Sequence, residues 1–356
     1  MTEGEFPPAT IPKICIALEF IELVEAATLV SQFSPQELAD FLNPEEHESA
    51  SPDNPNFRFS LLNFISLMSL SQDAYKAVHQ NSQQCFPGID LLSYSQVEQR
   101  TRTLTGLVFW EHHMCIKLCV VFTGPYLSLE HCPSCGEPRY KQKELEGSNG
   151  LRKVPRQVFT TFPVGPQLQA HWKHSQTAKD MFYRWEKTDE LLRECTVTGE
   201  PPQLFNGIFC GYDYLNLVCD RQINKYDSVL MLSINGAQLY KSKQSDVWIY
   251  IWILIDLAPD KRYKIKNILL GGVIPGPETP GDIDSFLFPG LSHLTALQKE
   301  GLPIWDAYHK ECAVSFLFLL LILANPVTMM ELSGSVGHHG QKGCRLLCGL
   351  IGQNKV

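Results

Sequence analysis

The sequence lacks a hydrophobic run long enough to cross a bilayer. Its longest apolar segment, Cys312–Ala324, falls well short of the roughly 20 residues that a membrane-spanning helix needs, and no charge clusters flank it. Residues Met1–Pro12 also lack the apolar core of a signal peptide. We therefore expect an intracellular protein, nuclear or cytoplasmic, with no membrane partner and no secretion, in which Cys312–Ala324 forms a buried strand.

Positive charge is also scarce. The 356 residues carry a formal net charge of −8, with 30 Lys and Arg against 38 Asp and Glu. The acidity is concentrated in residues 1–100, which hold 14 acidic and 4 basic residues, whereas residues 101–356 hold 24 acidic and 26 basic residues. This balance excludes a strongly basic nucleic-acid-binding protein. Any contact with DNA must then depend on local clusters of Lys and Arg.

The remaining composition is that of an ordinary globular protein, with 44% hydrophobic and 19% charged residues. Helical signals dominate the first hundred residues. Ser34-Pro35-Gln36-Glu37 is a capping box that predicts the start of a helix, and Phe59–Met68 and Ser71–Gln84 have apolar residues at helical spacing. These patterns predict a helical N-terminal region over residues 1–105.

Strand signals begin at Val229. Val229–Ile234, Val247–Ile255 and Tyr263–Leu270 are rich in β-branched and aromatic residues or alternate with lysines, which suits three antiparallel strands. The third run is expected to end before the Gly271-Gly272 break.

A helix and a further strand are expected after this break. Ile283–Lys299 has a mostly helical pattern interrupted by Pro289, and the run ending at Ala324 suits a fourth, fully buried strand. The order of three antiparallel strands, a helix and a buried strand predicts an α/β fold. Ribonuclease-H-like nucleases have this order, although the pattern alone also suits other α/β arrangements.

Four cysteines carry the strongest chemical motif. Cys115-x3-Cys119 is followed after twelve residues by Cys132-x2-Cys135, and two such pairs can present four thiolates to a tetrahedral Zn²⁺ ion. The alternative is four buried free cysteines. Since four protein ligands leave no open position, the zinc would be structural and would not activate water. The neighbouring histidines could replace a ligand, but we expect them to be surface neighbours; they are His112, His113 and His131.

Two further clusters invite weaker hypotheses. Cys344-x3-Cys348 with His338 and His339 resembles an incomplete second metal site. The segment from 139 to 156 carries six bases and two acids and could contact phosphates, although a solvated basic linker explains it equally well. The six bases are Arg139, Lys141, Lys143, Arg152, Lys153 and Arg156.

Long segments of the chain resemble transposases of CACTA (En/Spm-like) mobile elements. The resemblance covers nearly the whole sequence from about Phe57 and follows the family's order of segments. It divides the chain into a helical region (1–105), a zinc knuckle (106–150), a basic and helical connection (151–226) and a truncated core (227–356). The segments that carry it include FRFSLLNFISL, CFPGIDLLSY, VGPQLQA, LMLSINGAQLY, KSKQSDVWIYIWILIDLAPDKRYK, GGVIPGP, DSFLFPGL, LQKEGL and VGHHGQKGCRLLC.

The resemblance implies a DNA-cutting and strand-transfer enzyme with a ribonuclease-H-like core, in which an acidic triad holds two Mg²⁺ or Mn²⁺ ions. In this family the first acid stands in an aspartate-glycine pair that closes the first strand, where this sequence has Asn235-Gly236. Counting back from Leu332-Ser333-Gly334 places the second position at Asn325. Asparagine keeps the shape of aspartate but removes a unit charge, so these positions imply that the divalent ions are not bound here.

The third acid of the family, a glutamate, would follow the Cys344 pair, and the sequence given stops at Val356. Asp246, Asp256 and Asp260 could be proposed as substitutes, but acids at strand ends are more often solvated turn residues. We therefore expect a transposase-derived protein that is inactive as a nuclease. The alternative is a domesticated protein that retains the fold to bind DNA, such as transposon ends, or a partner, with self-association possible in either case.

Overall fold

The computed structural model describes residues 11–44, 54–67, 70–105, 108–200, 207–238, 246–276, 279–325, 328–329 and 332. The chain divides into two compact units, one formed by Met1–Pro44 with Phe109–Val356 and the other by Glu45–Val108. The helices expected within residues 1–105 are thus divided between the two units. None of the described helices is long and apolar enough to span a membrane.

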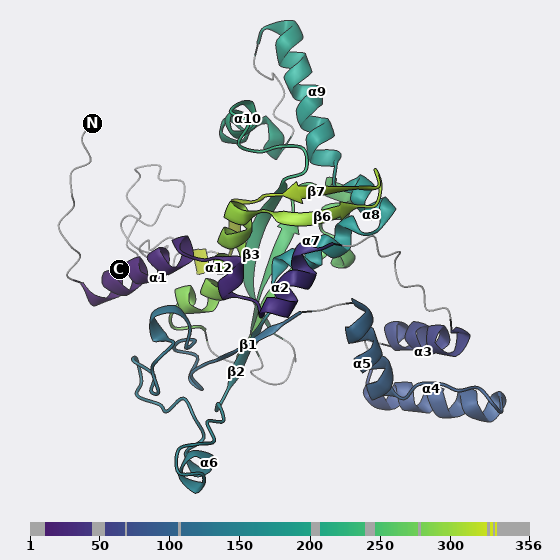
Figure 1. The fold of residues 1–356 in the computed structure, drawn as a ribbon, viewed down its shortest axis with the longest axis vertical. Coiled ribbons are helices and arrows are strands. Elements are labelled where there is room, and N and C mark those ends of the chain that lie inside the picture. The colour runs from purple at the N-terminus through teal and green to yellow at the C-terminus, as the bar shows by residue number, and fades with distance from the viewer. Residues whose placement is uncertain are drawn as a thin grey trace, which may run out of the picture. The chain divides into compact units, whose positions relative to one another are not determined.

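A six-stranded mixed sheet is the largest sheet of the first unit (Figure 1). Its strands follow the order β1-β2-β5-β4-β3-β8, and β6 and β7 form a separate hairpin. The strands are β1 Trp110–His113, β2 Val158–Thr161, β3 Ser228–Gln238, β4 Asp246–Leu254, β5 Ile268–Pro275, β6 Leu302–Asp306, β7 Glu311–Ser315 and β8 Leu317–Ala324.

Helices pack around this sheet in the same unit. They are α1 Pro12–Glu25, α2 Pro35–Leu42, α6 Gln142–Gly147, α7 Val164–Trp172, α8 Ser175–Asp180, α9 Tyr183–Thr198, α10 Tyr212–Cys219, α11 Pro259–Arg262 and α12 Ile283–Glu300. Short 3₁₀ segments connect some of them: η1 Leu29–Ser31, η2 Gly124–Tyr126, η3 Ile208–Cys210 and η4 Ile265–Asn267.

The three antiparallel strands expected from Val229 onward are confirmed as β3, β4 and β5, which pair in sequence order. The bounds predicted for the third strand are wrong, because β5 starts at Ile268 and runs through Gly271-Gly272. The ring of Tyr250 on β4 explains this. A Cβ atom on Gly271 would lie 2.2 Å from a ring carbon of Tyr250, so glycine lets the strand pass under the ring.

The prediction of one fully buried strand over Cys312–Ala324 is also wrong. The run is divided between β7 and β8, and β8 is an edge strand among the described strands. Its outer residues Leu321, Ile322 and Leu323 are 37%, 42% and 47% exposed. β8 pairs in parallel with β3, and the chain reaches it from β5 through α12 and the β6–β7 hairpin.

Each face of β3 contributes to a different hydrophobic core. Leu230, Leu232 and Ile234 pack in the larger cluster with side chains of α12. Val229 and Met231 pack in a second cluster with side chains of α10. This alternation follows from the two-residue period of a strand, and it makes β3 a central element covered on both faces.

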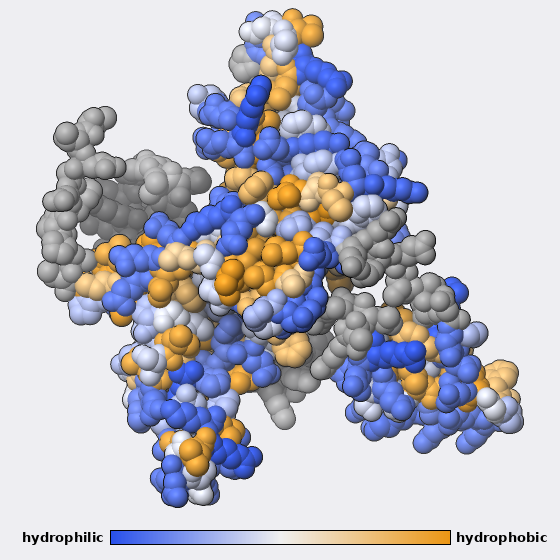
Figure 2. Space-filling model, viewed as in Figure 1, coloured by the Kyte–Doolittle hydropathy of each residue, from blue (hydrophilic) through white to orange (hydrophobic). Residues whose placement is uncertain are grey.

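Two N-terminal helices belong to this unit. The capping box expected at Ser34 is confirmed, because the Ser34 hydroxyl and the Glu37 carboxylate each bond the other residue's backbone N–H at the start of α2. The backbone N–H of Leu29 donates to the Glu300 carboxylate at the end of α12 at 2.8 Å. Apolar side chains also reach the surface along α1 (Figure 2), where Leu18 and Ile21 are 45% and 52% exposed.

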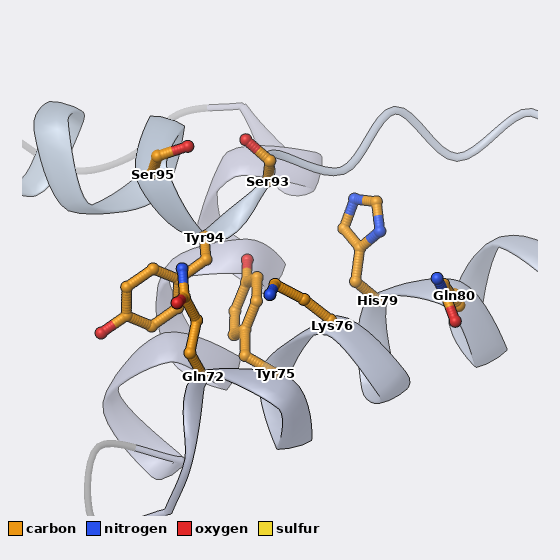
Figure 3. A pocket seen from close by; sticks show the side chains of 8 residues that line it. All are labelled: Gln72, Tyr75, Lys76, His79, Gln80, Ser93, Tyr94 and Ser95. Carbon is orange, nitrogen blue, oxygen red and sulfur yellow. The ribbon is translucent and has the colours of Figure 1, made fainter.

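The second unit contains three helices, α3 Pro55–Ser66, α4 Gln72–Cys85 and α5 Tyr94–Thr105. They meet through the aromatic rings of Phe64, Tyr75 and Tyr94. A small cavity of about 160 Å³ lies beside α4 and the start of α5, and Figure 3 shows the side chains that line it. Tyr75 and His79 line it and hydrogen-bond the backbone carbonyls of Leu92 and Leu91, which fixes the turn before α5.

Candidate functional site

The first cysteine pair lies in a tight turn directly after β1. An isolated bridge between Met114 and Val121 closes the turn, and Cys115 N–H donates to the carbonyl of Val120 at 3.0 Å. Leu118 adopts a left-handed conformation with φ of 53°, which reverses the chain between the two cysteines. The Lys117 N–H donates to the Cys115 Sγ at 3.4 Å. Cys115 and Cys119 therefore project toward the same side of the turn.

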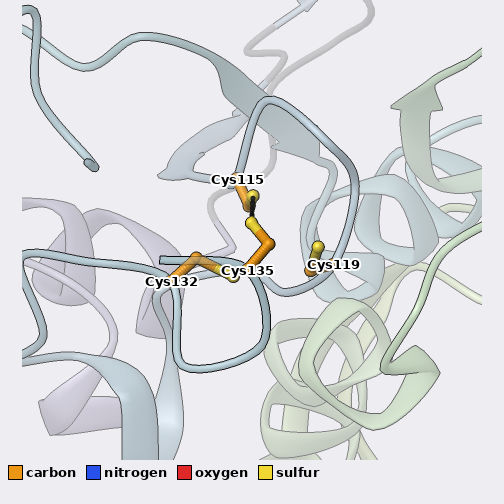
Figure 4. A group of neighbouring side chains, drawn as sticks. All are labelled: Cys115, Cys119, Cys132 and Cys135. Carbon is orange, nitrogen blue, oxygen red and sulfur yellow. Dashed lines mark hydrogen bonds between the residues drawn. The ribbon is translucent and has the colours of Figure 1, made fainter. Parts of the chain in front are cut away.

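The second pair lies in a similar turn. A bridge between His131 and Pro138 closes it, and the Gly136 N–H donates to the carbonyl of Cys132 at 2.9 Å. Gly136 has φ of 72° and open space where a Cβ atom would stand, so the conformation rather than crowding favours glycine there. This turn places Cys132 and Cys135 opposite the first pair (Figure 4).

The four sulfur atoms converge from these two turns. All four lie within 4.8 Å of one another, and the Sγ atoms of Cys115 and Cys135 are 3.5 Å apart. A tetrahedral zinc ion with Zn–S distances of about 2.3 Å requires sulfur atoms about 3.8 Å apart. The quartet predicted from spacing is therefore confirmed as a cluster, and its geometry fits a metal ion such as zinc.

Burial and the neighbouring thiols shift the pKa values of two cysteines in this cluster. Burial raises the pKa of the Cys119 thiol, and the neighbouring cysteines raise it further. Burial also raises the pKa of Cys132. A bound dication would stabilise the thiolates and reverse both shifts, as it does at other thiolate sites.

The cysteine turns are attached to the N-terminus of α12. The backbone N–H groups of Gly281 and Asp282 donate to the carbonyls of Leu118 and Cys119, both at 2.8 Å. Tyr126 donates its hydroxyl to the Asp282 carboxylate at 2.8 Å. A Cβ atom on Gly281 would lie 3.0 Å from the Cys119 carbonyl oxygen, which explains the glycine at this approach. The first cysteine turn is thus joined by hydrogen bonds to the start of α12.

The nearby histidines lie outside the four-residue cluster. His112 places Nε2 2.9 Å from the Thr161 hydroxyl, and burial, with a smaller effect from His113, lowers the pKa of His112 to about 4. His113 accepts a hydrogen bond from Arg139 Nε at Nδ1. His131 is exposed. All three are neighbours of the cluster, as expected, but only His131 is the exposed surface residue that the sequence predicted.

The basic segment is largely occupied by contacts within the protein. Arg139 is buried and donates to the carbonyls of Leu127 and Leu129, so it cannot face a phosphate. Three others pair with acids: Arg152 with Glu144 at 3.0 Å, Lys153 with Glu130 at 2.6 Å and Arg156 with Glu137 at 2.6 Å. Among the described residues, Lys141 and Lys143 are exposed and have no ion-pair partner. Phosphate contact by this segment stays a prediction, and these two lysines are its exposed bases without an ion-pair partner among the described residues.

The two asparagines lie near one end of the sheet: Asn325 directly follows β8, whereas Asn235 lies within β3, which does not close at Asn235-Gly236 as expected but continues to Gln238. The parallel register pairs Ile234 on β3 with Ala324 on β8, so the next residues, Asn235 and Asn325, stand at the same level. Ile234 belongs to the hydrophobic cluster that includes α12, and Ala324 packs against that cluster. Because successive side chains of a strand point to opposite faces of the sheet, Asn235 and Asn325 point toward the other face. Asn325 Oδ1 accepts the Thr328 N–H at 2.9 Å, and Asn235 is exposed. Their catalytic assignment stays a prediction.

The alternative acids do not join this pair. Asp256 lies beyond the opposite end of β4 and accepts a hydrogen bond from Val229 N–H, at the start of β3, at 2.8 Å. Contrary to the expectation of a solvated turn residue, it is buried and pairs with Arg184. Asp260 is exposed on α11, and the backbone of Asp246 pairs with Gln238, past Asn235 on β3.

One further group of ligand-type side chains was not anticipated. Asp306, His309 and Glu311 meet at the β6–β7 hairpin, and Asp306 Oδ2 lies 2.6 Å from His309 Nδ1. The Asp-x2-His-x-Glu spacing could have indicated it. Asp306 Oδ1 also accepts the Tyr308 N–H at 2.9 Å, so this group stabilises the turn of the hairpin. The incomplete second site, His338, His339, Cys344 and Cys348, lies outside the described residues.

Comparison with protein families gives a match over the C-terminal third of the chain. Residues 227–350 match the model of the transposase family tnp2. The matched segment begins just before β3 and extends beyond β8, so it contains both Asn235 and Asn325. No curated protein matches the chain. The match supports a transposase-related origin, and with it a DNA partner for the family.

Proposed function

We propose that this chain derives from a CACTA-type DNA transposase with a ribonuclease-H-like core, and that it binds DNA without cleaving it. The strand order β5-β4-β3-β8 supports this core assignment. Three antiparallel strands precede α12, and β8, which the chain reaches after the separate β6–β7 hairpin, lies parallel to the first of them. All four strands lie within the segment that matches the transposase family tnp2.

The level positions of Asn235 and Asn325 on neighbouring strands carry the proposal. Two-metal strand cleavage needs carboxylates that bridge and neutralise ions about 3.5–4 Å apart. Aspartates at these two positions would stand at one sheet end and on one face, where they could share an ion. Asparagine offers only neutral oxygen there, and Asn325 Oδ1 already accepts the Thr328 N–H. Mg²⁺ or Mn²⁺ is therefore not held for catalysis.

The cysteine quartet has a structural part in this proposal. A zinc ion held by Cys115, Cys119, Cys132 and Cys135 would fix two turns whose cysteines pack in a small cluster of their own, while Met114, Leu118 and Val121 of the first turn belong to the core of the sheet. Those turns lie beside the basic segment, in which Lys141 and Lys143 are exposed. Phosphate contact by these lysines would give the protein a DNA-binding surface beside its zinc-stabilised module.

Cleavage and metal binding test the loss of activity. The full chain is incubated with supercoiled plasmid and with Mg²⁺ or Mn²⁺, and we expect no nicking above a protein-free control. The double variant Asn235→Asp/Asn325→Asp should bind Mn²⁺ on the order of tenfold more tightly than the unchanged protein, because it restores two carboxylates at one site.

A matched control separates this site from a general change in charge. Asn149→Asp/Asn216→Asp adds the same charge away from the sheet end and should leave Mn²⁺ affinity unchanged. Metal-dependent nicking by the unchanged protein would overturn the proposed inactivity. Equal Mn²⁺ affinities of the two double variants would overturn the assignment of Asn235 and Asn325. If the protein binds duplexes that carry transposon-end sequences more tightly than duplexes of random sequence, that result would favour a domesticated DNA-binding role.

A further inference from the structure

At the end of the β6–β7 hairpin (Figure 1), two acidic residues stand directly opposite each other. Asp306 is the last residue of β6 and Glu311 the first of β7, and they are partners in the antiparallel register. Like charges in directly opposite positions destabilise a pair of strands. Among the described residues, Asp306 forms an ion pair with His309, and neither carboxylate pairs with a lysine or an arginine. The hairpin therefore carries a local excess of negative charge, which a bound cation would offset.

The buried carboxylate of Asp306 has one oxygen atom fixed by the backbone and one that faces side chains. Oδ1 accepts the N–H groups of Tyr308 at 2.9 Å and of His309 at 3.2 Å, which sets the orientation of the carboxylate in the turn. Oδ2 lies 2.6 Å from His309 Nδ1 and 3.4 Å from the Tyr226 hydroxyl. Because the partners of Oδ2 are side chains, an ion can take their place without disturbing the backbone of the turn.

The ring of His309 is held beside this oxygen by two aromatic neighbours. Its centroid lies 5.0 Å from that of Phe182 and 4.7 Å from that of Tyr308, and both contacts are edge-to-face. The side chain of His309 is nevertheless 37% exposed, and Glu311 is exposed as well. The ring is thus positioned before any ion arrives, and an ion can reach it from solvent.

Tyr226 supplies a hydrogen bond to the same group but no charge. Its hydroxyl donates to the Glu311 carboxylate. Burial raises the pKa of Tyr226, and the carboxylates of Glu311 and Asp306 raise it further, so the hydroxyl stays neutral. The nearby Lys225 does not offset the acids either, because its Nζ lies over the ring of Phe182, 4.7 Å from the centroid. A neutral donor leaves most of the repulsion between the two carboxylates in place.

Three ligand-type atoms converge closely enough to share one ion. Asp306, His309 and Glu311 each offer one oxygen or nitrogen atom, and these atoms all lie within 4.8 Å of one another. Ligands at about 2.0–2.2 Å from a tetrahedral zinc ion stand about 3.3–3.6 Å apart. Rotation of the exposed His309 and Glu311 side chains is enough to reach these separations, since Asp306 is already fixed.

The combination of ligands indicates which kind of ion fits. Mg²⁺ and Ca²⁺ prefer oxygen ligands alone, whereas an imidazole with carboxylates suits zinc and similar transition-metal ions. The position separates this group from the asparagine pair. Tyr226 stands two residues before β3 begins at Ser228, whereas Asn235 lies toward the other end of that strand. The group is also distinct from the cysteine quartet, which offers only thiolates.

We propose that Asp306, His309 and Glu311 form a second zinc site, with Asp306 Oδ2, His309 Nδ1 and a Glu311 carboxylate oxygen as ligands. The ion takes the place of the proton between Asp306 Oδ2 and His309 Nδ1, which is released to solvent, and it displaces the Tyr226 hydroxyl from Glu311. Three protein ligands leave a fourth position for water. The bound ion stabilises the end of the hairpin, and this inference goes beyond the proposed DNA-binding function.

The test adds Zn²⁺ to the full chain after one equivalent has filled the cysteine quartet. Isothermal titration calorimetry then follows the second equivalent. We expect one further Zn²⁺ per chain to bind, more weakly than the first, because three ligands on an exposed hairpin replace four converging thiolates. The second equivalent should also raise the temperature of unfolding, since it binds the folded hairpin and not the unfolded chain.

Two variants assign this second binding event to the hairpin. His309→Gln and Glu311→Gln each remove one ligand, and each should weaken the second Zn²⁺ by at least about tenfold, because losing even an outer partner of a ligand costs roughly 10–100-fold. The matched controls are His79→Gln, in the three-helix unit, and Glu22→Gln, exposed on α1. Both should bind the second Zn²⁺ as the unchanged protein does. Thermal unfolding without added metal checks that each variant is folded.

The outcomes decide the assignment. Weaker binding of the second Zn²⁺ in both hairpin variants, with both controls unchanged, supports the site. Absence of a second binding event in the unchanged protein would overturn it. The same conclusion follows if the second event has equal affinity in the unchanged protein and in both hairpin variants, or if only one of the two variants weakens it.

Discussion

The guanidinium of Arg184 and the carboxylate of Asp256 form a buried ion pair, with Arg184 Nε 2.6 Å from Asp256 Oδ1. Arg184 also donates to the Tyr214 hydroxyl at 3.1 Å and to the carbonyl of Asp227 at 2.7 Å. Asp256 accepts the Val229 N–H. The pair therefore joins α9 and α10 to the ends of β3 and β4, and it fixes the sheet from which Asn235 projects.

Breaking this pair should destabilise the protein strongly. Arg184→Met leaves the Asp256 carboxylate buried without its cation, and we expect the free energy of unfolding to fall by about 3–5 kcal/mol in urea denaturation. The control is Arg193→Met, which removes an exposed pair with Asp189 and should change stability by less than about 1 kcal/mol. Similar losses for both variants would contradict a structural role specific to Arg184.

Metal removal should loosen a defined part of the molecule. We expect one zinc per chain held by the quartet, and chelation or Cys132→Ser should release it. Hydrogen exchange should then accelerate at the Gly281 and Asp282 amides, because their acceptors are carbonyls of the first cysteine turn. Cys219→Ser, at an exposed cysteine, should retain the metal. Unchanged exchange at Gly281 after verified metal loss would show that zinc does not stabilise this junction.

Features with a local cause could be predicted from the sequence. The capping box at Ser34 acts within one helical turn, and the paired spacing of the quartet is set by two short turns. The antiparallel order of β3, β4 and β5 follows from apolar runs separated by turn signals. The level positions of Asn235 and Asn325 came from a family resemblance, because no local pattern relates two residues so far apart.

Features with a distant cause could not be predicted. Gly271-Gly272 suggested a break in the strand. Both glycines instead lie within β5, because the ring of Tyr250 occupies the space that their side chains would need. Arg139 belongs to a basic run in sequence, yet its partners are carbonyls from residues 127 and 129 and the His113 ring. Contacts with residues distant in the sequence determine the strand at Gly271-Gly272 and the burial of Arg139. Such contacts cannot be predicted from the neighbouring residues in the sequence.

DNA affinity should depend on the two unpaired lysines. Lys141→Ala/Lys143→Ala should weaken binding to any duplex and reduce the slope of log affinity against log salt by about 2, since each phosphate contact contributes about 0.9. Fluorescence anisotropy at several salt concentrations measures both effects. Lys153→Ala, which removes a lysine paired with Glu130, should change the slope little. A slope that is the same in the double variant and the unchanged protein would exclude phosphate contact at these positions.

The free energy of unfolding should decrease as the pH is lowered, over a range set by His293. This histidine is fully buried, and burial lowers its pKa to about 3. In the unfolded chain its pKa is near 6.5, so between about pH 6.5 and 3 only the unfolded state binds the proton, and stability falls by up to about 1.4 kcal/mol per pH unit. His293→Gln should remove this contribution to the slope of unfolding free energy against pH. If His293→Gln keeps the full slope, the protons are taken up elsewhere in the chain, and the neutral His293 ring that donates from Nδ1 to Gln32 loses its support.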